Sequence, residues 1–262
     1  MVCAMRFPVL LAALLFVTAC GEEKTYESTL DKVLDTKVLI VGTEPNFPPF
    51  ETKNEKGEFV GFDMDMVRLL ASELGVELRL EEMEFPSLIP ALKTGKIDLI
   101  ASGMTAKPER AKSVSFTDPY FHTALCLLVN RKSGIGSAAD IGAHKIAVKQ
   151  GTTGQMNAPE LFPEAELVVM QNETDCSNEV AFGRVDAFLY DQLSIVKAHD
   201  KHKETTLALL EPLTKEPYSM AVRLGDQRFL DRINEFLVVI RADGRYQELR
   251  DKYLAGIPDA TD

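Results

Sequence analysis

Short apolar runs alternate with segments of helical periodicity in the first half of the chain. Residues 37–43, KVLIVGT, form a continuous apolar run of the kind found in strands covered on both faces. Asp63 then opens a segment with apolar residues at helical spacing, and Gly75 follows it where a left-handed cap would end a helix. The pattern repeats and predicts a strand at 76–80, a helix at 87–93 and a strand at 97–101. This alternation predicts an α/β layered sheet.

A second succession of the same kind occupies the other half. The expected elements are a strand at 145–148, a turn at 151–154 leading into a helix, and strands at 166–170 and 187–190. Near the C-terminus we expect a strand at 219–222 and a helix whose apolar face runs from Phe229 to Ile240 and ends near Gly244. Two such successions indicate two α/β lobes. Because ligands of α/β sheets bind beyond the carboxyl ends of strands, a binding cleft is expected between the lobes.

The N-terminus has the pattern of an export signal. Arg6 precedes an apolar stretch that is too short to span a bilayer comfortably and that ends in small residues before Cys20. We therefore expect residues 1–19 to be a signal peptide, with either Met1 or Met5 as the start.

The end of this signal, Val-Thr-Ala-Cys at residues 17–20, resembles the lipobox of bacterial lipoproteins. The resemblance implies cleavage before Cys20 and a lipid on its sulfur, so that residues 20–36 would form an anchor and tether. The alternative is an ordinary secretory signal with an incidental cysteine. In either case the protein is expected outside the cytoplasm, and the lipid would hold it to a bacterial membrane at the periplasm or cell surface.

Composition and charge narrow the classes of partner. With 45% hydrophobic and 26% charged residues, the chain has the composition of an ordinary globular protein. Its formal net charge is −11 at pH 7, which repels nucleic acids and anionic membrane surfaces. We therefore expect no binding of nucleic acid.

Cysteine and histidine positions do not indicate a metal site or another cofactor. The four histidines are scattered, and no cysteine or histidine spacing is typical of zinc ligands. Cys126 and Cys176 either pair in the oxidising environment of an exported protein or remain two separate buried thiols.

Seven motifs carry a family resemblance. They are VGTEPNFPPFE at 41–51, GFDMD at 61–65, LIPAL at 88–92, PER at 108–110, FTDPY at 116–120, QGTT at 150–153 and GRVDA at 183–187. Dense and in order, they resemble the family-3 bacterial extracellular solute-binding proteins for polar amino acids, over residues 37 to 254. The resemblance implies the two-lobed α/β periplasmic-binding-protein type II fold. Lobe 1 would comprise 37–120 plus 219–257 and lobe 2 would comprise 121–218, with two hinge crossings, near Phe121 and Tyr218.

A free amino acid brings one carboxylate and one ammonium, and burying either requires an opposite charge. Arg110 suits the carboxylate because its planar fork donates two parallel hydrogen bonds. The resemblance implies that Thr105 and the Thr153 amide assist Arg110, while Asp191, the Gly103 carbonyl and Thr105 hold the ammonium. The alternatives are a solvated Arg110, and Asp191 and Thr153 acting only as helix caps.

Other candidate residues surround the rest of the ligand. Phe47 and Phe85 match positions where the family places rings on either side of the ligand. A core position is the alternative interpretation of Phe85. Ser102 completes the expected set on lobe 1. Glu44 and Lys149 stand where relatives read the ligand side chain, and together they favour glutamine or another uncharged polar side chain, then a cationic one, then glutamate.

The expected function is therefore capture of a free polar amino acid by hinge closure, followed by recognition by the membrane permease of an ABC transporter. An enzyme is the rival class, because a few similar proteins are periplasmic cyclohexadienyl dehydratases, whose chemistry needs a positioned acid or base. Glu44, Glu173 and His122 are the candidates for that role. An amino-acid sensory domain on the same fold is the third interpretation, and such domains usually come fused to a transmembrane helix.

Overall fold

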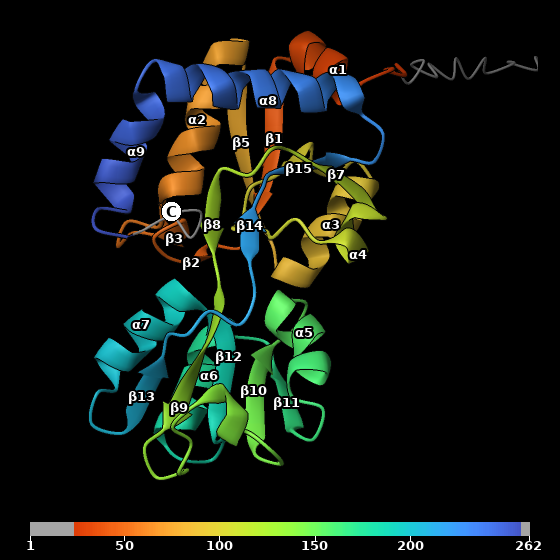
Figure 1. The fold of residues 1–262 in the computed structure, drawn as a ribbon. Helices are drawn as coiled ribbons and strands as arrows, with labels where there is room; N and C mark the ends of the chain where they lie inside the picture. Colours follow the sequence, from red (N-terminus) through yellow and green to blue (C-terminus); the bar gives the residue numbers. More distant parts are fainter. Residues whose placement is uncertain (1–23, 258–262) are drawn as a thin grey trace, which may run out of the picture.

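Two α/β lobes stacked end to end make up the molecule (Figure 1). The computed structural model describes residues 24–257, so the expected signal peptide and Cys20 lie outside the described residues. The predicted elements are present, with ends displaced by at most two residues. No helix within residues 24–257 combines the length and apolar character that crossing a membrane requires.

Lobe 1 is built on a five-stranded sheet that draws its strands from both ends of the chain. In spatial order the strands are β5 (Glu77–Glu82), β1 (Val38–Thr43), β6 (Leu99–Ile100), β15 (Ala221–Arg223) and β7 (Val114–Phe116). The apolar run predicted at 37–43 forms β1, which pairs in parallel with β5 and β6. β15 runs antiparallel to β6 and β7 and so inserts the C-terminal part of the chain into the sheet.

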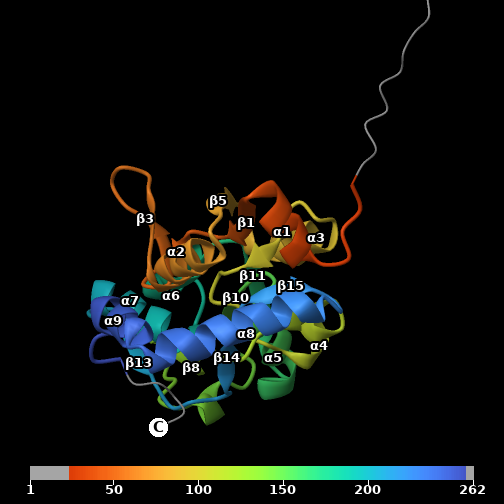
Figure 2. The same cartoon turned by 90° about the horizontal axis from the view of Figure 1, so that it is seen from above.

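Helices surround this sheet. They are α1 (Thr29–Thr36), α2 (Phe62–Leu74), α3 (Phe85–Lys93), α4 (Pro108–Ala111), α8 (Gln227–Ala242) and α9 (Arg245–Tyr253). Among them, α9 packs against α2 and α8. α2 ends at Gly75, whose left-handed conformation is the predicted cap. α8 crosses the end of lobe 1 that lies away from lobe 2 (Figures 1 and 2). A small sheet of β2 (Asn46–Phe47), β3 (Glu51–Lys53) and β4 (Phe59–Val60) adjoins α2.

The structure differs from the sequence expectation at the tether. Residues 29–36, which the sequence analysis assigned to a tether, form α1 and belong to lobe 1. Ser28 caps the helix by accepting a hydrogen bond from the Leu30 amide, and Leu30 and Val33 are buried in the core. Asp226 fastens the helix start to α8 by accepting from the Thr29 amide at 2.7 Å. An ordered helix with buried apolar side chains is part of the fold and not a spacer.

Lobe 2 has the same architecture as lobe 1, but one contiguous segment of the chain forms it. Its strands, in spatial order, are β11 (Glu166–Met170), β10 (Lys145–Lys149), β12 (Ala187–Asp191), β9 (Leu125–Asn130) and β13 (Thr206–Leu209). Its helices are α5 (Thr153–Leu161), α6 (Glu173–Ala181), α7 (Gln192–Lys201) and the short 3₁₀ helix η1 (Ala138–Asp140). Cys126 and Cys176 are both buried and unpaired, so the interpretation as two separate thiols is the one the structure supports.

Two short strands connect the lobes. β8 (Phe121–Thr123) leads from lobe 1 into lobe 2, and β14 (Glu216–Tyr218) leads back. They pair antiparallel, with Phe121 opposite Tyr218, and form a two-stranded ribbon between the lobes (Figure 1). The predicted crossings near Phe121 and Tyr218 are confirmed.

Candidate functional site

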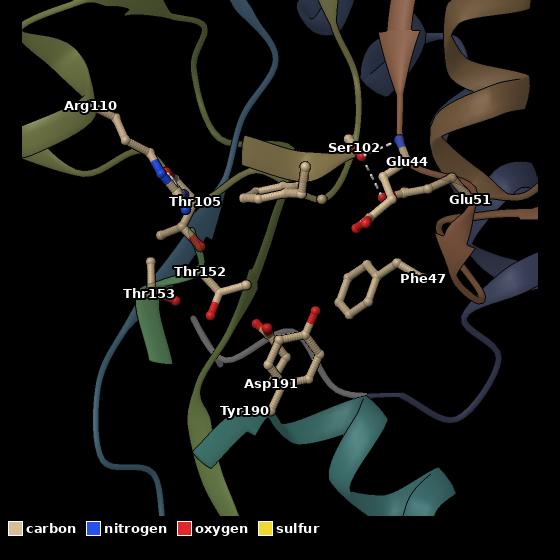
Figure 3. A pocket seen from close by; sticks show the side chains of 12 residues that line it. Glu44, Phe47, Glu51, Ser102, Thr105, Arg110, Thr152, Thr153, Tyr190 and Asp191 are labelled. Atoms are coloured by element: carbon tan, nitrogen blue, oxygen red, sulfur yellow. Dashed lines mark hydrogen bonds between the residues drawn. The ribbon is translucent and has the colours of Figure 1, made fainter. Parts of the chain in front are cut away.

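A small cavity lies between the lobes, at the carboxyl ends of β1, β6 and β12. Residues of both lobes line it: Glu44, Phe47, Glu51, Phe85, Ser102, Gly103, Thr105, Arg110, Thr152, Thr153, Tyr190 and Asp191. In Figure 3, Arg110 and the threonines stand on one side, Glu44, Glu51 and Phe47 on the other, and Tyr190 and Asp191 enter from lobe 2. The cavity therefore carries groups of both signs.

Arg110, in α4, is a buried guanidinium that has no carboxylate partner among residues 24–257. It donates to the carbonyl oxygens of Thr105 and, across the lobes, Gly151, each at 2.9 Å. Its Cζ lies 5.2 Å from the centre of the Phe85 ring. Burial lowers the pKa of the guanidinium, and the negative charges of Glu216 and Asp191 oppose that shift. Because a guanidinium has five N–H donors, Arg110 retains the capacity to bind a carboxylate.

Asp191 is a buried carboxylate that has no cation beside it in the described part of the chain. It ends β12 and precedes α7, but its side chain makes no capping hydrogen bond. Instead it accepts a hydrogen bond from the hydroxyl of Tyr218, in the hinge strand β14. Burial, and then the nearby charge of Glu216, raise the pKa of Asp191 to about 7. This carboxylate would be stabilised by a bound cation.

The N-terminus of α5 adds hydrogen-bond donors for an anion. Thr152 is its N-cap, with extended backbone geometry, and its hydroxyl donates to the Lys149 carbonyl at 2.7 Å. The first amides of the helix have no intrahelical partner, and the helix dipole favours negative charge there. Gly154 lets α5 approach β12 closely, since a Cβ at this position would lie 2.6 Å from the Leu189 carbonyl oxygen.

Glu44 and Lys149 form a buried ion pair across the lobes. Glu44 follows β1 and Lys149 ends β10, and both side chains are at most 5% exposed. The ammonium also lies 5.9 Å from the centre of the Phe85 ring. Phe85, at the start of α3, is thus shared between the two cations of the site. The two residues expected to read a ligand side chain are paired with each other.

Behind the cavity, buried carboxyl groups fix the backbone of lobe 1. Ser102 donates to Glu51 Oε1 and accepts from the Glu44 amide, both at 3.0 Å (Figure 3). Asp63 accepts from the Gly103 amide at 2.9 Å. Burial raises the pKa of Glu51 well above its ordinary value, with the charge of Asp63 as the second cause, and burial raises the pKa of Asp63 to about 6.

The structure gathers the residues singled out by sequence. All of the predicted ligand-binding residues line the cavity except Lys149, whose ammonium donates to the carboxylate of Glu44. Glu51 and Tyr190 also line it and were missed. Of the acid or base candidates, Glu44 is engaged by Lys149, while Glu173 and His122 do not line the cavity.

Metal ligands do not cluster in the part of the chain that the structure describes. No group of three or more His, Cys, Asp or Glu residues within 24–257 has the geometry to hold a metal ion.

Two α/β lobes joined by a paired hinge, with a charged cavity between them, define a type II periplasmic binding protein. The chain belongs to the bacterial extracellular solute-binding proteins, family 3, whose model matches residues 39–256.

Similar proteins include a glutamine-binding ABC transporter protein of Bacillus subtilis (strain 168), 31% identical over 95% of both chains. The L-arginine-binding protein of Pseudomonas aeruginosa is 34% identical, over 84% of this chain and 88% of its own. Among solved structures, an ancestral amino acid-binding protein described as a precursor of cyclohexadienyl dehydratase is 36% identical. It superposes with a TM-score of 0.79, over 86% of this chain and 99% of its own.

Proposed function

We propose that this protein captures a free polar amino acid outside the cytoplasm and presents it to the membrane permease of an ABC importer. One observation carries the proposal: Arg110 and Asp191 face the same closed cavity, and each lacks an ionic partner among residues 24–257. Burying two opposite charges that are not paired with each other or with another group costs free energy. An α-amino acid supplies the matching carboxylate and ammonium in one molecule.

The roles of the surrounding groups follow from their chemistry. The α-carboxylate would take the free N–H groups of Arg110 and the amide of Thr153, while the α-ammonium would take Asp191 and the hydroxyl of Thr105. The Phe47 and Phe85 rings would enclose the apolar part of the ligand. Lobe 1 contributes Arg110 and lobe 2 contributes Asp191, so both poles of the ligand are satisfied only when the lobes close.

The Glu44–Lys149 pair determines which ligand side chains the site favours. With the two charges neutralising each other, an uncharged amide can donate to Glu44 and accept from Lys149 without adding a charge. Glutamine is therefore the first choice, and the cationic amino acids come second. The glutamine-binding and arginine-binding relatives support both classes of ligand.

Calorimetric titration of Arg110 variants with a panel of amino acids tests the proposal. Truncating one partner of a buried ionic contact costs roughly 2 to 5 kcal/mol, about thirty-fold to several-thousand-fold in affinity. Arg110→Ala should therefore nearly abolish binding, and Arg110→Lys should bind poorly because one ammonium cannot reproduce the fork. Arg79→Ala, which removes an exposed arginine of β5, is the matched control. A folded Arg110→Ala protein that keeps wild-type affinity overturns the assignment.

We propose a binding protein in preference to an enzyme because the candidate acid and base residues do not come together in the cavity. Glu44 is paired, and Glu173 and His122 lie away from the cavity lining. Incubation with cyclohexadienyl acids such as prephenate and arogenate, followed by assay of aromatic products, should show no turnover above the uncatalysed rate.

Membrane attachment through Cys20 is a further part of the proposal. The lipobox-like residues 17–20 and the short apolar stretch before them support it. Cys20→Ser in the full chain should move the protein from the membrane fraction to the soluble fraction or leave the signal uncleaved. Unchanged processing and location of this variant would rule out lipidation.

A further inference from the structure

Glu173, the first residue of α6, has a buried oxygen without a partner. The residue as a whole is half-buried, but its Oε2 is shielded from solvent and accepts no hydrogen bond within residues 24–257. Burial raises the pKa of the carboxyl to about 6. A hydrogen bond from Ser194, and after it the ammonium groups of Lys149 and Lys197, partly oppose this shift. Lys197 is exposed on α7, so it is screened by water.

Lys149 and Glu173 sit at adjacent strand ends of lobe 2. In the sheet register Lys149 lies opposite Met170, the last residue of β11, and Glu173 follows three residues later. The Gln150 amide donates to the Met170 carbonyl at 2.8 Å, which keeps the two chain segments together. Lys149 and Glu173 also line one groove, separate from the ligand cavity. The Lys149 ammonium is paired with Glu44 of lobe 1, and it is close enough to Glu173 of its own lobe for its charge to lower the pKa of that carboxyl.

The charges near this lysine are balanced differently for different ligands. For an amino acid with an uncharged side chain, Lys149 pairs with Glu44, and Glu173 is left without an ionic partner. An amino acid with a cationic side chain adds a second cation beside Lys149. The two cations can then pair with the two carboxylates, Glu44 and Glu173. Each buried cation then has its own carboxylate, which a buried charge requires.

We propose that Glu173 is a second acceptor for the Lys149 ammonium and that this exchange admits cationic amino acids to the site. A ligand cation takes Glu44, and Lys149 turns to Glu173 within lobe 2. The substrate class then comprises arginine and lysine beside glutamine. This inference rests on the proposed function, because it concerns the side-chain end of the same amino-acid site.

Calorimetric titration of the wild-type protein and three variants with arginine, lysine and glutamine tests the exchange. Glu173→Gln should lower the ratio of arginine to glutamine affinity roughly ten-fold or more, since Lys149 then has no second carboxylate. Glu173→Asp, which keeps the charge on a shorter arm, should hold the ratio closer to wild type. Asp175→Asn removes an exposed carboxylate from the same helix and should leave the ratio unchanged.

A double-mutant cycle separates this role from a structural one. Once Lys149→Met has removed the ammonium, adding Glu173→Gln should leave the arginine-to-glutamine ratio within about two-fold, because the carboxylate has no lysine to accept. Equal losses in both backgrounds would mark Glu173 as structural and overturn the inference. Thermal unfolding checks that each variant is folded.

Two further outcomes separate this inference from the proposed function. A wild-type protein that binds glutamine but neither arginine nor lysine overturns the exchange and leaves the proposed function standing. A protein that binds no amino acid overturns both.

Discussion

The charge of Asp191 is costly until a cation reaches it. Its pKa of about 7 in the ligand-free site reflects that cost. A bound ammonium favours the ionised form and lowers this pKa, so below pH 7 the ligand must displace a proton. Affinity should therefore fall about ten-fold between pH 8 and pH 6, with proton uptake by the buffer.

Calorimetry in buffers of different ionisation enthalpy measures both quantities. Asp191→Asn removes the titrating group, so its binding should be weaker and nearly independent of pH over this range. A wild-type profile that is flat from pH 8 to pH 6 would contradict the role given to Asp191.

At single residues, the sequence predicted which side chains belong to the site better than it predicted which residues those side chains contact. Arg110 and the α5 threonines lie in motifs whose order along the chain is recognisable, Asp191 follows the last of these motifs, and all of them line one cavity. Glu51 and Tyr190 were missed because nothing local distinguishes a carboxylate or ring that faces a cavity from one that packs elsewhere. The Glu44–Lys149 pair was also beyond prediction, since the residues are 105 positions apart and meet only when two lobes close.

Among elements, α5 depends on a glycine for its place. A methyl group at Gly154 would collide with backbone and not with a flexible side chain, so the helix start must shift away from β12. Gly154→Ala should lower the free energy of unfolding by about 1 to 3 kcal/mol and weaken amino-acid binding, because the Thr153 amide moves with the helix.

Gly136→Ala is the matched control for this prediction. A Cβ at Gly136 would meet only a carboxylate oxygen of Asp140, at 3.7 Å. Denaturant unfolding and calorimetry should therefore show a near-neutral change for this variant. If Gly154→Ala proved as neutral, the close packing of α5 on β12 would not matter for the site.

Elements with strong apolar periodicity were predictable, and those that depend on distant contacts were not. β1 and α8 carry their pattern in their own residues and appear where expected. α1 was assigned to the tether because its eight residues are mostly polar, and its stability comes from a cap and from contacts with α8 nearly 200 positions away. The strand expected at 97–101 is reduced to Leu99–Ile100, although the Asp98 and Ala101 amides on either side still donate to the carbonyls of Ile40 and Gly42 in β1.

For the molecule as a whole, the Glu44–Lys149 pair links the lobes without a ligand. Removing it should shift the ligand-free protein toward an open form, since a buried inter-lobe contact that exists only in the closed state favours closure. Lys149→Met should show a larger radius of gyration by small-angle X-ray scattering than wild type when both are free of ligand. Saturating glutamine should bring the two values together.

Lys145→Met provides the control for this shift. Lys145 begins the same strand, but its partner Glu166 belongs to the same lobe, at 3.4 Å. Its loss should leave the scattering curve unchanged. Equal radii for Lys149→Met and wild type would show that the ion pair does not bias the lobes.

The position of β15 also decides the order in which the chain can fold. It lies between β6 and β7, yet its first residue is Ala221, whereas β7 ends at Phe116. Lobe 2 is one continuous segment and can complete its sheet as soon as that segment is available. Lobe 1 keeps a gap in its sheet until about the last sixth of the chain arrives, and such long-range pairing is slow. A protein built this way keeps lobe 1 unfinished until its C-terminal segment has been synthesised.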